Sequence, residues 1–140
     1  SISIPDSVTS IGNYAFHKCN SLTSISIPDS VTSIGSYTFY DCNSLTSITL
    51  SNSLTSIPSY IFTRCTSLTS ISIPDSVTSI GNYAFHKCNS LTSIMMSNSV
   101  ISIGNGLFKN VPSTCVMNVS STWNQTLATN ADYEGIFVID

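Results

Sequence analysis

The stretch SISIPDSVTSIGNYAFHKCNSLTSI fills residues 1–25, and the same 25 letters return unchanged at residues 70–94. The two copies begin 69 residues apart, which is three times 23. When the chain is aligned with itself at a period of 23 residues, its apolar residues fall into six columns, which begin at Ile2, Ile4, Val8, Ile11, Phe16 and Leu22. A fixed period of this length predicts a solenoid, because one repeat cannot bury its apolar face alone and must stack on its neighbours.

The composition agrees with a folded array. Ser and Thr together supply 45 of the 140 residues (29 and 16), while 41% of the chain is hydrophobic and only 8% is charged. Because the apolar residues are strictly placed, disorder is the weaker interpretation. The net charge of -3, with the four Lys and Arg spread along the chain, predicts no nucleic-acid binding. No apolar run approaches the roughly 18 residues that span a bilayer, and no signal-peptide pattern is present, so we expect no membrane insertion of this segment.

Residues 22–44 illustrate the local structure expected in one repeat. LTSISI alternates apolar and hydroxyl residues and is rich in β-branched side chains, which predicts a strand. Pro28, Asp29 and Ser30 then predict a turn, VTSI at 31–34 predicts a second short extended piece, and Gly35 is expected at a corner where φ can be positive. The following SYTFYDCN is interpreted as a short turn or a helical or 3₁₀ turn.

The frame Leu-x-x-Ile-x-Ile-Pro-x-Ser-Val-x-x-Ile-Gly-x-x-Ala-Phe-x-x-Cys resembles the BspA-like leucine-rich repeat of bacterial and protist surface proteins. Four full frames and a partial one cover about residues 1–113, with local departures at Ser51, Pro58, Ser97, Gly106 and Val111. The resemblance implies a right-handed, curved β/turn solenoid with the LTSISI strands in a parallel sheet, and short 3₁₀ or helical turns on the other side. It also implies a secreted or cell-surface location and a role in binding or adhesion.

Two segments are expected, an array of about five 23-residue coils over residues 1–113 and a C-terminal cap over residues 114–140. Ser1 aligns with Ser24, so we expect that the array starts within a strand as a piece of a longer array. Because solenoids normally need polar caps, contact between copies of the chain through this first coil is a hypothesis for a homo-oligomer. The last coil is expected to be covered by Trp123, Ile136, Phe137 and Val138.

Five cysteines raise the question of disulfides or metal. Cys19, Cys42, Cys65 and Cys88 form one column and Cys115 stands outside it. Neighbouring coils stack about 5 Å apart, which permits a disulfide by Cα distance, but parallel Cβ vectors make its dihedral hard to reach. A straight line of four thiols cannot surround one tetrahedral zinc ion. Free buried thiols are the preferred interpretation, with one disulfide between adjacent coils as the alternative.

Three polar columns were weighed as sites of chemistry. His17 and His86 share a column with Tyr40, Thr63 and Lys109, and such variety predicts a solvated edge rather than a metal or base site. The next column, which begins at Lys18, is expected to behave likewise. A third column holds Asp6, Asp29 and Asp75, which predict side chains that cap their own turns, with weak calcium binding as the alternative. No nucleophile with a partner base can be named, so we expect no enzyme, no cofactor and no metal.

Two formal glycosylation sequons begin at Asn118 and Asn124. Chance matches are common in a chain so rich in Ser and Thr, so they are modest evidence for a secreted route in a eukaryote.

The hydroxyl columns are the main candidate for function. An uncharged, repetitive face suits attachment to proteins or glycans of a host or matrix through many weak contacts. A structural spacer or coat element that binds only further copies is the alternative, and ice binding by regular Thr rows is a remote one. The candidate binding face comprises Thr23, Thr46, Thr69, Thr92, Ser26, Thr49 and Ser72.

Overall fold

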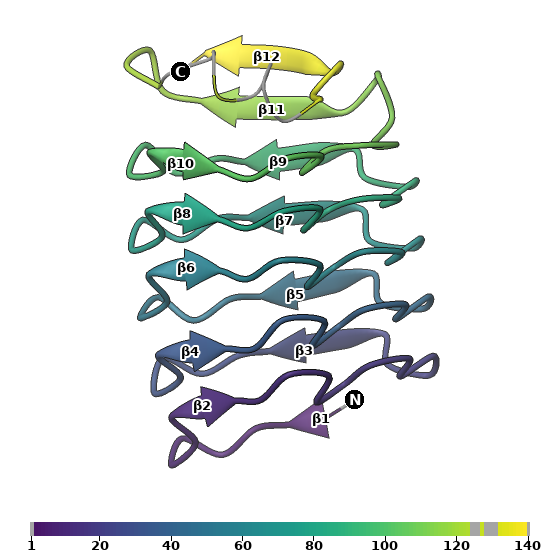
Figure 1. Cartoon of the computed structure of the whole chain (residues 1–140), viewed down its shortest axis with the longest axis vertical. Helices are drawn as coiled ribbons and strands as arrows, with labels where there is room; N and C mark the ends of the chain where they lie inside the picture. Colours follow the sequence, from purple (N-terminus) through teal and green to yellow (C-terminus); the bar gives the residue numbers. More distant parts are fainter. Residues whose placement is uncertain (1, 124–126, 128–131, 140) are drawn as a thin grey trace.

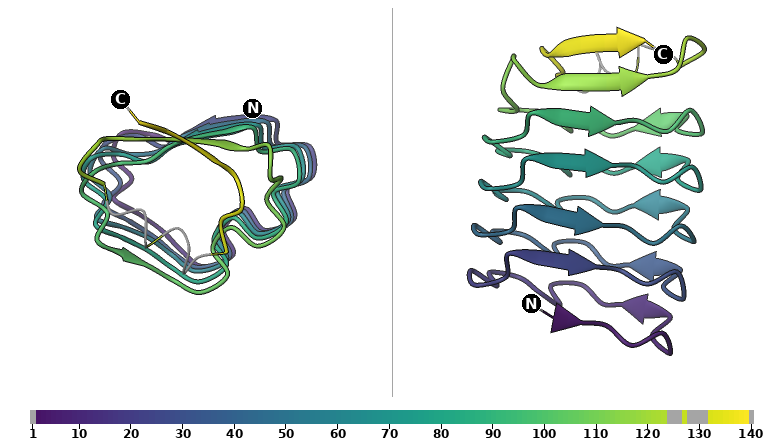
Figure 2. Two further views of the ribbon diagram at one scale, coloured as in Figure 1. Left: turned by 90° about the horizontal axis from the view of Figure 1, so that it is seen from above. Right: turned by 180° about the vertical axis from the view of Figure 1, so that it is seen from behind.

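A computed structural model describes residues 2–123, 127 and 132–139. The chain is a parallel β-solenoid of about six turns with almost no helix. Successive coils stack along one axis with their strands aligned (Figure 1), and the view down that axis shows the coils superposed around a common interior (Figure 2). The predicted solenoid is therefore confirmed.

Each of the first five coils contributes two strands, and the row that begins with β1 is called the longer strands because its members in the second to fifth coils have three residues, against two in the other row. The longer strands and the two strands of the last coil are β1 (Ile2–Ser3), β3 (Ser24–Ser26), β5 (Ser47–Thr49), β7 (Ser70–Ser72), β9 (Ser93–Met95), β11 (Val116–Val119) and β12 (Ile136–Ile139). The shorter strands are β2 (Ser10–Ile11), β4 (Ser33–Ile34), β6 (Ser56–Ile57), β8 (Ser79–Ile80) and β10 (Ser102–Ile103).

The strands pair in the register that the repeat predicts. Ile25 of β3 lies opposite Ile2 of β1 and Ile48 of β5, one repeat away on either side. Ile25 is buried while Ser24 and Ser26 are exposed, as alternation along a strand requires. The turn at Pro28 closes with a bond from the Val31 amide to the Pro28 carbonyl at 3.0 Å. The predicted strands and turn are confirmed, although the strands are shorter than the LTSISI segments.

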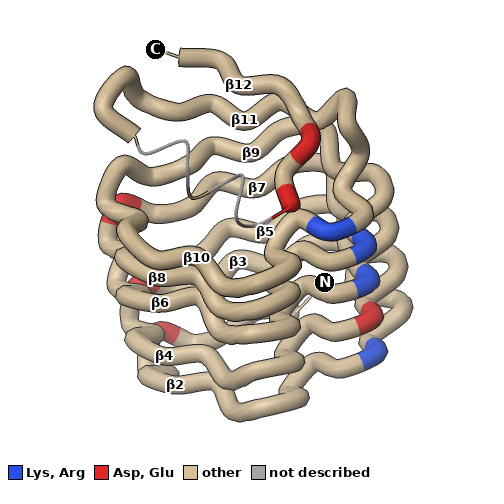
Figure 3. Tube along the Cα trace, turned by 45° about the horizontal axis from the view of Figure 1, so that its top comes forward, with Lys and Arg blue, Asp and Glu red and all other residues tan. Residues whose placement is uncertain are grey.

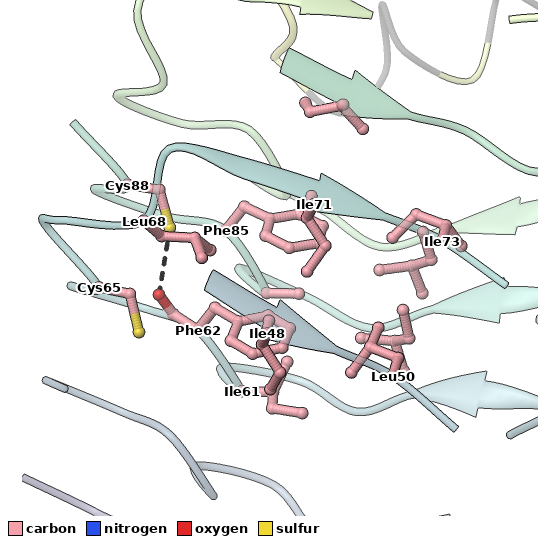
Figure 4. Close-up of a cluster of buried hydrophobic side chains, with 14 of the residues drawn as sticks. Ile48, Leu50, Ile61, Phe62, Cys65, Leu68, Ile71, Ile73, Phe85 and Cys88 are labelled. Carbon is pink, nitrogen blue, oxygen red and sulfur yellow. Dashed lines mark hydrogen bonds between the residues drawn. The ribbon is translucent and has the colours of Figure 1, made fainter. Parts of the chain in front are cut away.

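The interior is filled by columns of identical or similar side chains. Five phenylalanines stack along the axis with nearly parallel rings, and their centroids lie 5.3–6.0 Å apart. Phe62 packs beneath Phe85 and beside the aliphatic columns of Ile48 and Ile71 (Figure 4). These contacts join each coil to the next, which is how a solenoid builds a core that no single coil has.

The segment after each shorter strand is formed by turns, which confirms the short turn predicted there, while the helical alternative is not formed. Tyr14 and Lys18 both have left-handed backbones, with φ of 61° and 57°, and the equivalent residues of later coils repeat this pattern. The amides of Tyr14, Phe16 and Lys18 donate to carbonyls of the next coil, while the intervening amides bond within their own turn. A helix would use every amide internally, so the left-handed residues are what allow lateral bonding on this side.

In the column that begins at Gly12, glycine was expected to provide a positive φ, but it serves the close packing of coils instead. Gly35 does not have a positive φ, since Gly106 is the one described glycine that does. Instead, a Cβ on Gly35 would collide with the backbone of Asn13 in the preceding coil. The glycine therefore permits close approach of two coils, and its amide donates to the Ile11 carbonyl at 2.8 Å.

Pro58 interrupts this arrangement in the third coil. Gly81 and Gly104 each donate an amide bond to the coil before them, at 2.8 Å, but proline has no N–H to donate. The shorter strands accordingly divide into two sheets, β2-β4 and β6-β8-β10. The longer strands also divide, between β5 and β7. Because Pro58 replaces a glycine whose amide would bond to the preceding coil, β6 does not pair with β4.

The C-terminal segment continues the stack before it closes it. β11 pairs with β9 in register, with Met117 opposite Ile94, and β12 pairs with β11. Trp123 is buried and Phe137 packs against the core, as expected of covering residues. Ile136 and Val138, however, are 52% and 42% exposed, so their predicted covering role is wrong. Tyr133 covers the interior instead, and its hydroxyl donates to the Cys115 carbonyl at 2.7 Å.

Candidate functional site

The predicted binding face exists as a surface of the array. All seven of its residues are exposed, because they alternate with the buried isoleucines of β3, β5 and β7 or directly precede these strands. We call this surface the strand face: Thr23, Thr46, Thr69, Thr92, Ser26, Thr49 and Ser72. No charged residue occupies these positions.

Three of the four threonines of the strand face, Thr46, Thr69 and Thr92, donate their hydroxyl protons to carbonyls of the preceding coil. The hydroxyl of Thr46 donates to the Thr23 carbonyl at 2.9 Å, and that of Thr92 donates to the Thr69 carbonyl at 3.0 Å. Each of these carbonyls also accepts the amide of the same threonine. These three threonines therefore bond one coil to the next, and only their hydroxyl lone pairs remain for a ligand.

The three other residues of the strand face are different. The hydroxyls of Ser26, Thr49 and Ser72 form no side-chain hydrogen bond within the described residues. Ser26 lies directly opposite Thr49, and Ser72 lies opposite Met95 in β9. Together with Thr23, whose hydroxyl also donates no bond within the described residues, these three hydroxyls are the part of the predicted site that keeps both donor and acceptor capacity.

The fifth coil breaks the hydroxyl pattern with two exposed apolar side chains. Met95 is 53% exposed where earlier coils carry Ser or Thr, and Ile101 is 77% exposed at the end of a column of threonines. Neither residue was among the predicted site residues. Both could have been found from the sequence, because each replaces a Ser or Thr of its column by an apolar residue.

The two sequons have different outcomes. Asn118 lies within β11, between β9 and β12, and is partly buried. The hydroxyl of Ser120 in the same sequon donates to the Asn98 side chain at 2.9 Å. Glycosylation of Asn118 stays a prediction, and Asn124 lies outside the described residues.

The cysteines are free thiols, as preferred. Cys42, Cys65, Cys88 and Cys115 are buried and Cys19 is partly exposed. The Cys88 thiol donates to the Phe62 carbonyl of the preceding coil at 3.2 Å (Figure 4), and Cys42 and Cys65 repeat this bond. Burial raises the pKa of Cys42 and of Cys115 to about 11, and raises that of Cys65 and Cys88 as well.

These thiols are expected to resist alkylation while the chain is folded. Because the thiolate is the reactive form, a raised pKa and burial both suppress reaction at pH 8. Iodoacetamide at that pH should modify Cys19 alone in the native chain and all five cysteines in urea, counted by intact mass. Rapid native modification of Cys65 or Cys88 would contradict the burial of this column.

The aspartate column caps neighbouring coils. The Asp29 carboxylate accepts the backbone amide of Asn52, in the next coil, at 2.9 Å, so the predicted capping of its own turn is wrong for this residue. In another column, the side chains of Asn13 and Asn82 likewise accept a backbone amide of the next coil. Among the residues that the structure describes, no group of three or more metal-ligating side chains is present, which leaves the calcium alternative without support.

The histidine column is less exposed than expected. His17 and His86 are partly buried against tyrosine rings, and Thr63 is buried with its hydroxyl bonded to the Tyr83 carbonyl. Burial lowers the pKa of His86, although the hydrogen bond that its ring Nε2 donates to the Asn110 Oδ1 opposes this shift. Different residues can occupy this column because it lies on a shallow surface lined by aromatic rings, and not because it is fully exposed to solvent.

The basic residues share one edge, which corrects the expectation that they are spread out. Lys18, Arg64, Lys87 and Lys109 lie along the turn side, with Asp41 among them (Figure 3). Residues that are 23 positions apart become neighbours in adjacent coils, so distance in the sequence concealed the alignment. Among the described residues, no helix has the length and apolarity of a membrane span.

A family model for the BspA-type leucine-rich repeat region matches residues 1–117 as six copies. The chain belongs to the BspA-type leucine-rich repeat family. The resemblance drawn from the repeat frame is thereby confirmed. A search of curated proteins found no match.

Solved structures of leucine-rich repeat proteins share this fold. A leucine-rich repeat protein of T. pallidum is 34% identical with a TM-score of 0.75, and the alignment covers 80% of this chain and 52% of that one. A leucine-rich cell surface protein of Faecalibacterium prausnitzii is 30% identical over 99% of this chain and 31% of that one, with a TM-score of 0.73. A leucine-rich repeat protein of Bacteroides ovatus is 29% identical over 99% and 42%, with a TM-score of 0.78.

The chain therefore spans between about a third and a half of the length of these solved chains. BspA-type repeats and these neighbours are leucine-rich repeat proteins, a generally non-enzymatic class of interaction modules.

Proposed function

We propose that this chain is a non-enzymatic attachment module, secreted or at a cell surface, whose strand face binds a host or matrix protein or glycan. The single observation that carries the proposal is the row of free hydroxyls at Ser26, Thr49 and Ser72, exposed at the same position in three consecutive coils. The description of the F. prausnitzii neighbour as a cell surface protein supports the location.

Binding by such a face would be distributed over coils. One exposed hydroxyl contributes on the order of 1 kcal/mol when it forms a hydrogen bond to a ligand. Repeated contacts on one rigid array add without the cost of ordering separate modules, so affinity should grow with the number of coils engaged. Two hollows follow one another along this row, one of about 580 Å³ lined by Ser26 and Thr49 and one of about 160 Å³ lined by Thr49 and Ser72, which fits an extended ligand better than a small molecule.

The test is a binding screen followed by a matched pair of variants. The purified chain is screened against matrix proteins and glycans, and the best ligand is titrated by surface plasmon resonance. The triple variant Ser26→Ala, Thr49→Ala and Ser72→Ala removes the free hydroxyls and should weaken binding at least about tenfold, since three hydrogen bonds are lost.

The control variant removes three exposed hydroxyls from the shorter strands by Ser33→Ala, Ser56→Ala and Ser102→Ala, and binding should change less than about twofold. Equal loss in both variants, or no saturable ligand, would count against the strand face.

A structural spacer or self-associating element is the second candidate. The observation in its favour is that Thr46, Thr69 and Thr92 already use their hydroxyl protons to join coils. Light scattering of the same samples decides between the two: self-association with concentration, together with no ligand, would favour the spacer and the predicted contact between copies at the first coil.

A further inference from the structure

The turn side carries a rigid aromatic column. Tyr14, Tyr37, Tyr60 and Tyr83 stack face to face, with ring centroids 4.8, 4.8 and 5.4 Å apart and interplanar angles of 9°, 4° and 17°. Their faces are used by one another, so each tyrosine turns its ring edge outward. This stack fixes the spacing of the surface groups beside it at about one coil, roughly 5 Å.

Cations flank this column at a fixed position in the repeat. Lys18, Arg64 and Lys87 each stand four residues after a stacked tyrosine and have left-handed backbones, with φ of 57°, 65° and 62°. Their amides bond to carbonyls of the next coil at 2.9–3.0 Å, which holds the base of each side chain in place. All three side chains are on exposed residues. The positive charges are therefore presented in a line on a stiff support.

This line is partly compensated. Within the described residues, the single ion pair joins Arg64 to Asp41 at 3.6 Å, and Lys18 and Lys87 have none. At the C-terminal end of the edge, Asp132 and Glu134 line one hollow with Lys109, whereas Asp6, Asp29 and Asp75 follow the longer strands. The part of the edge from Lys18 to Lys87 thus carries three cations and one carboxylate. Like charges in a row repel one another, and an anionic ligand would relieve that repulsion.

A hollow of about 260 Å³ lies on this edge across three coils. Its walls include the side chains of Tyr37, Tyr40, Tyr60, Arg64, His86 and Lys87. Tyr40 is tilted 54° from Tyr37, so it stands outside the stack and does not share its ring face with that tyrosine. The hollow therefore combines two cations with phenol and imidazole groups that form hydrogen bonds.

We infer that this edge, centred on Arg64 and Lys87, binds a sulfated polysaccharide chain. Such a ligand carries anionic groups at intervals along one extended chain, which matches cations on successive coils. It also carries ring hydroxyls and apolar ring faces between those groups, which match the tyrosines of the hollow. An acidic peptide would use the cations but not these uncharged groups. The inference is independent of the strand face, which lies on another side of the coil.

The test measures fluorescence anisotropy of a labelled heparin oligosaccharide with the whole chain at low and moderate salt. Binding should weaken with salt, with a slope near two ions for two cations engaged. The double variant Arg64→Gln and Lys87→Gln should weaken binding at least about tenfold and remove most of the salt dependence. Circular dichroism checks that both exposed substitutions leave the fold intact.

Two controls separate the edge from bulk charge and from the strand face. Asp6→Asn with Asp75→Asn shifts the net charge by two units in the opposite direction and should change affinity less than about threefold. The alanine variant of Ser26, Thr49 and Ser72 should bind heparin like the unmodified chain. Absence of heparin binding at low salt, an unchanged affinity in the Gln variant, or equally tight binding of poly-glutamate or duplex DNA would each overturn the inference.

Discussion

Phe62→Ala is expected to lower the free energy of unfolding by about 3–5 kcal/mol, which is the usual cost of deleting a buried aromatic ring. Phe62 is fully buried at the middle of the phenylalanine column. Its ring stacks between those of Phe39 and Phe85, with centroid separations of 5.8 and 5.5 Å. The truncation therefore weakens the interfaces on both sides of one coil. In a solenoid the interfaces between neighbours carry most of the stability, and losing two of them in the centre should uncouple the two halves.

Urea denaturation followed by circular dichroism measures this effect. A single transition in the unmodified chain should become lower and broader, or split into two, in the Phe62 variant. Phe16→Ala is the matched control, because Phe16 is partly exposed and stacks only on Phe39, at 5.3 Å. Its cost should be less than half as large. Equal costs at the two positions would show that coil interfaces do not dominate the stability.

Gly81→Ala is expected to cost about 1–3 kcal/mol, the range for forcing an extra methyl group into a packed site. A Cβ at residue 81 would stand 2.5 Å from the Ser59 amide nitrogen and 2.8 Å from its Cα, so the backbone of a neighbouring coil must move. That movement would also strain the bond from the Gly81 amide to the Ile57 carbonyl. Pro58 shows the result of losing that bond, since it has no amide hydrogen to donate and β6 does not pair with β4.

Thermal unfolding of Gly81→Ala and Gly12→Ala provides the comparison. Gly12 occupies the same column, but nothing lies within 4 Å of the position its Cβ would take. Alanine there should change stability by less than about 0.5 kcal/mol, with a small gain from the stiffer unfolded chain. If both substitutions proved equally harmful, close approach of coils would not be the reason for glycine in this column.

Much of this architecture was available from the 23-residue period. The period placed Ile25 opposite Ile2 and Ile48, assigned the strand and its turn at Pro28, and indicated that Cys42, Cys65 and Cys88 were small buried side chains. It also gave the exposed positions of the strand face. These features depend on which residues are apolar and how they recur, because burying a repeated apolar pattern in a stack has one register that satisfies every coil.

The tertiary structure decided what depends on contacts between coils. Local preference did not predict left-handed backbones at Tyr14 and Lys18, since large side chains disfavour them, and only the lateral hydrogen bonds of the turn side account for them. The same is true of Gly35, whose small size serves an approach from another coil.

The candidate sites divide in the same way. The sequence by itself determined that hydroxyl residues would line one side of a solenoid. Whether their protons were free was decided by the carbonyl one coil away, which takes the proton of Thr46 and leaves that of Thr49. The positive edge was also decided by stacking, because a step of 23 residues along the chain becomes a step of about 5 Å between coils, and only at that distance are Arg64 and Lys87 close enough to contact one ligand.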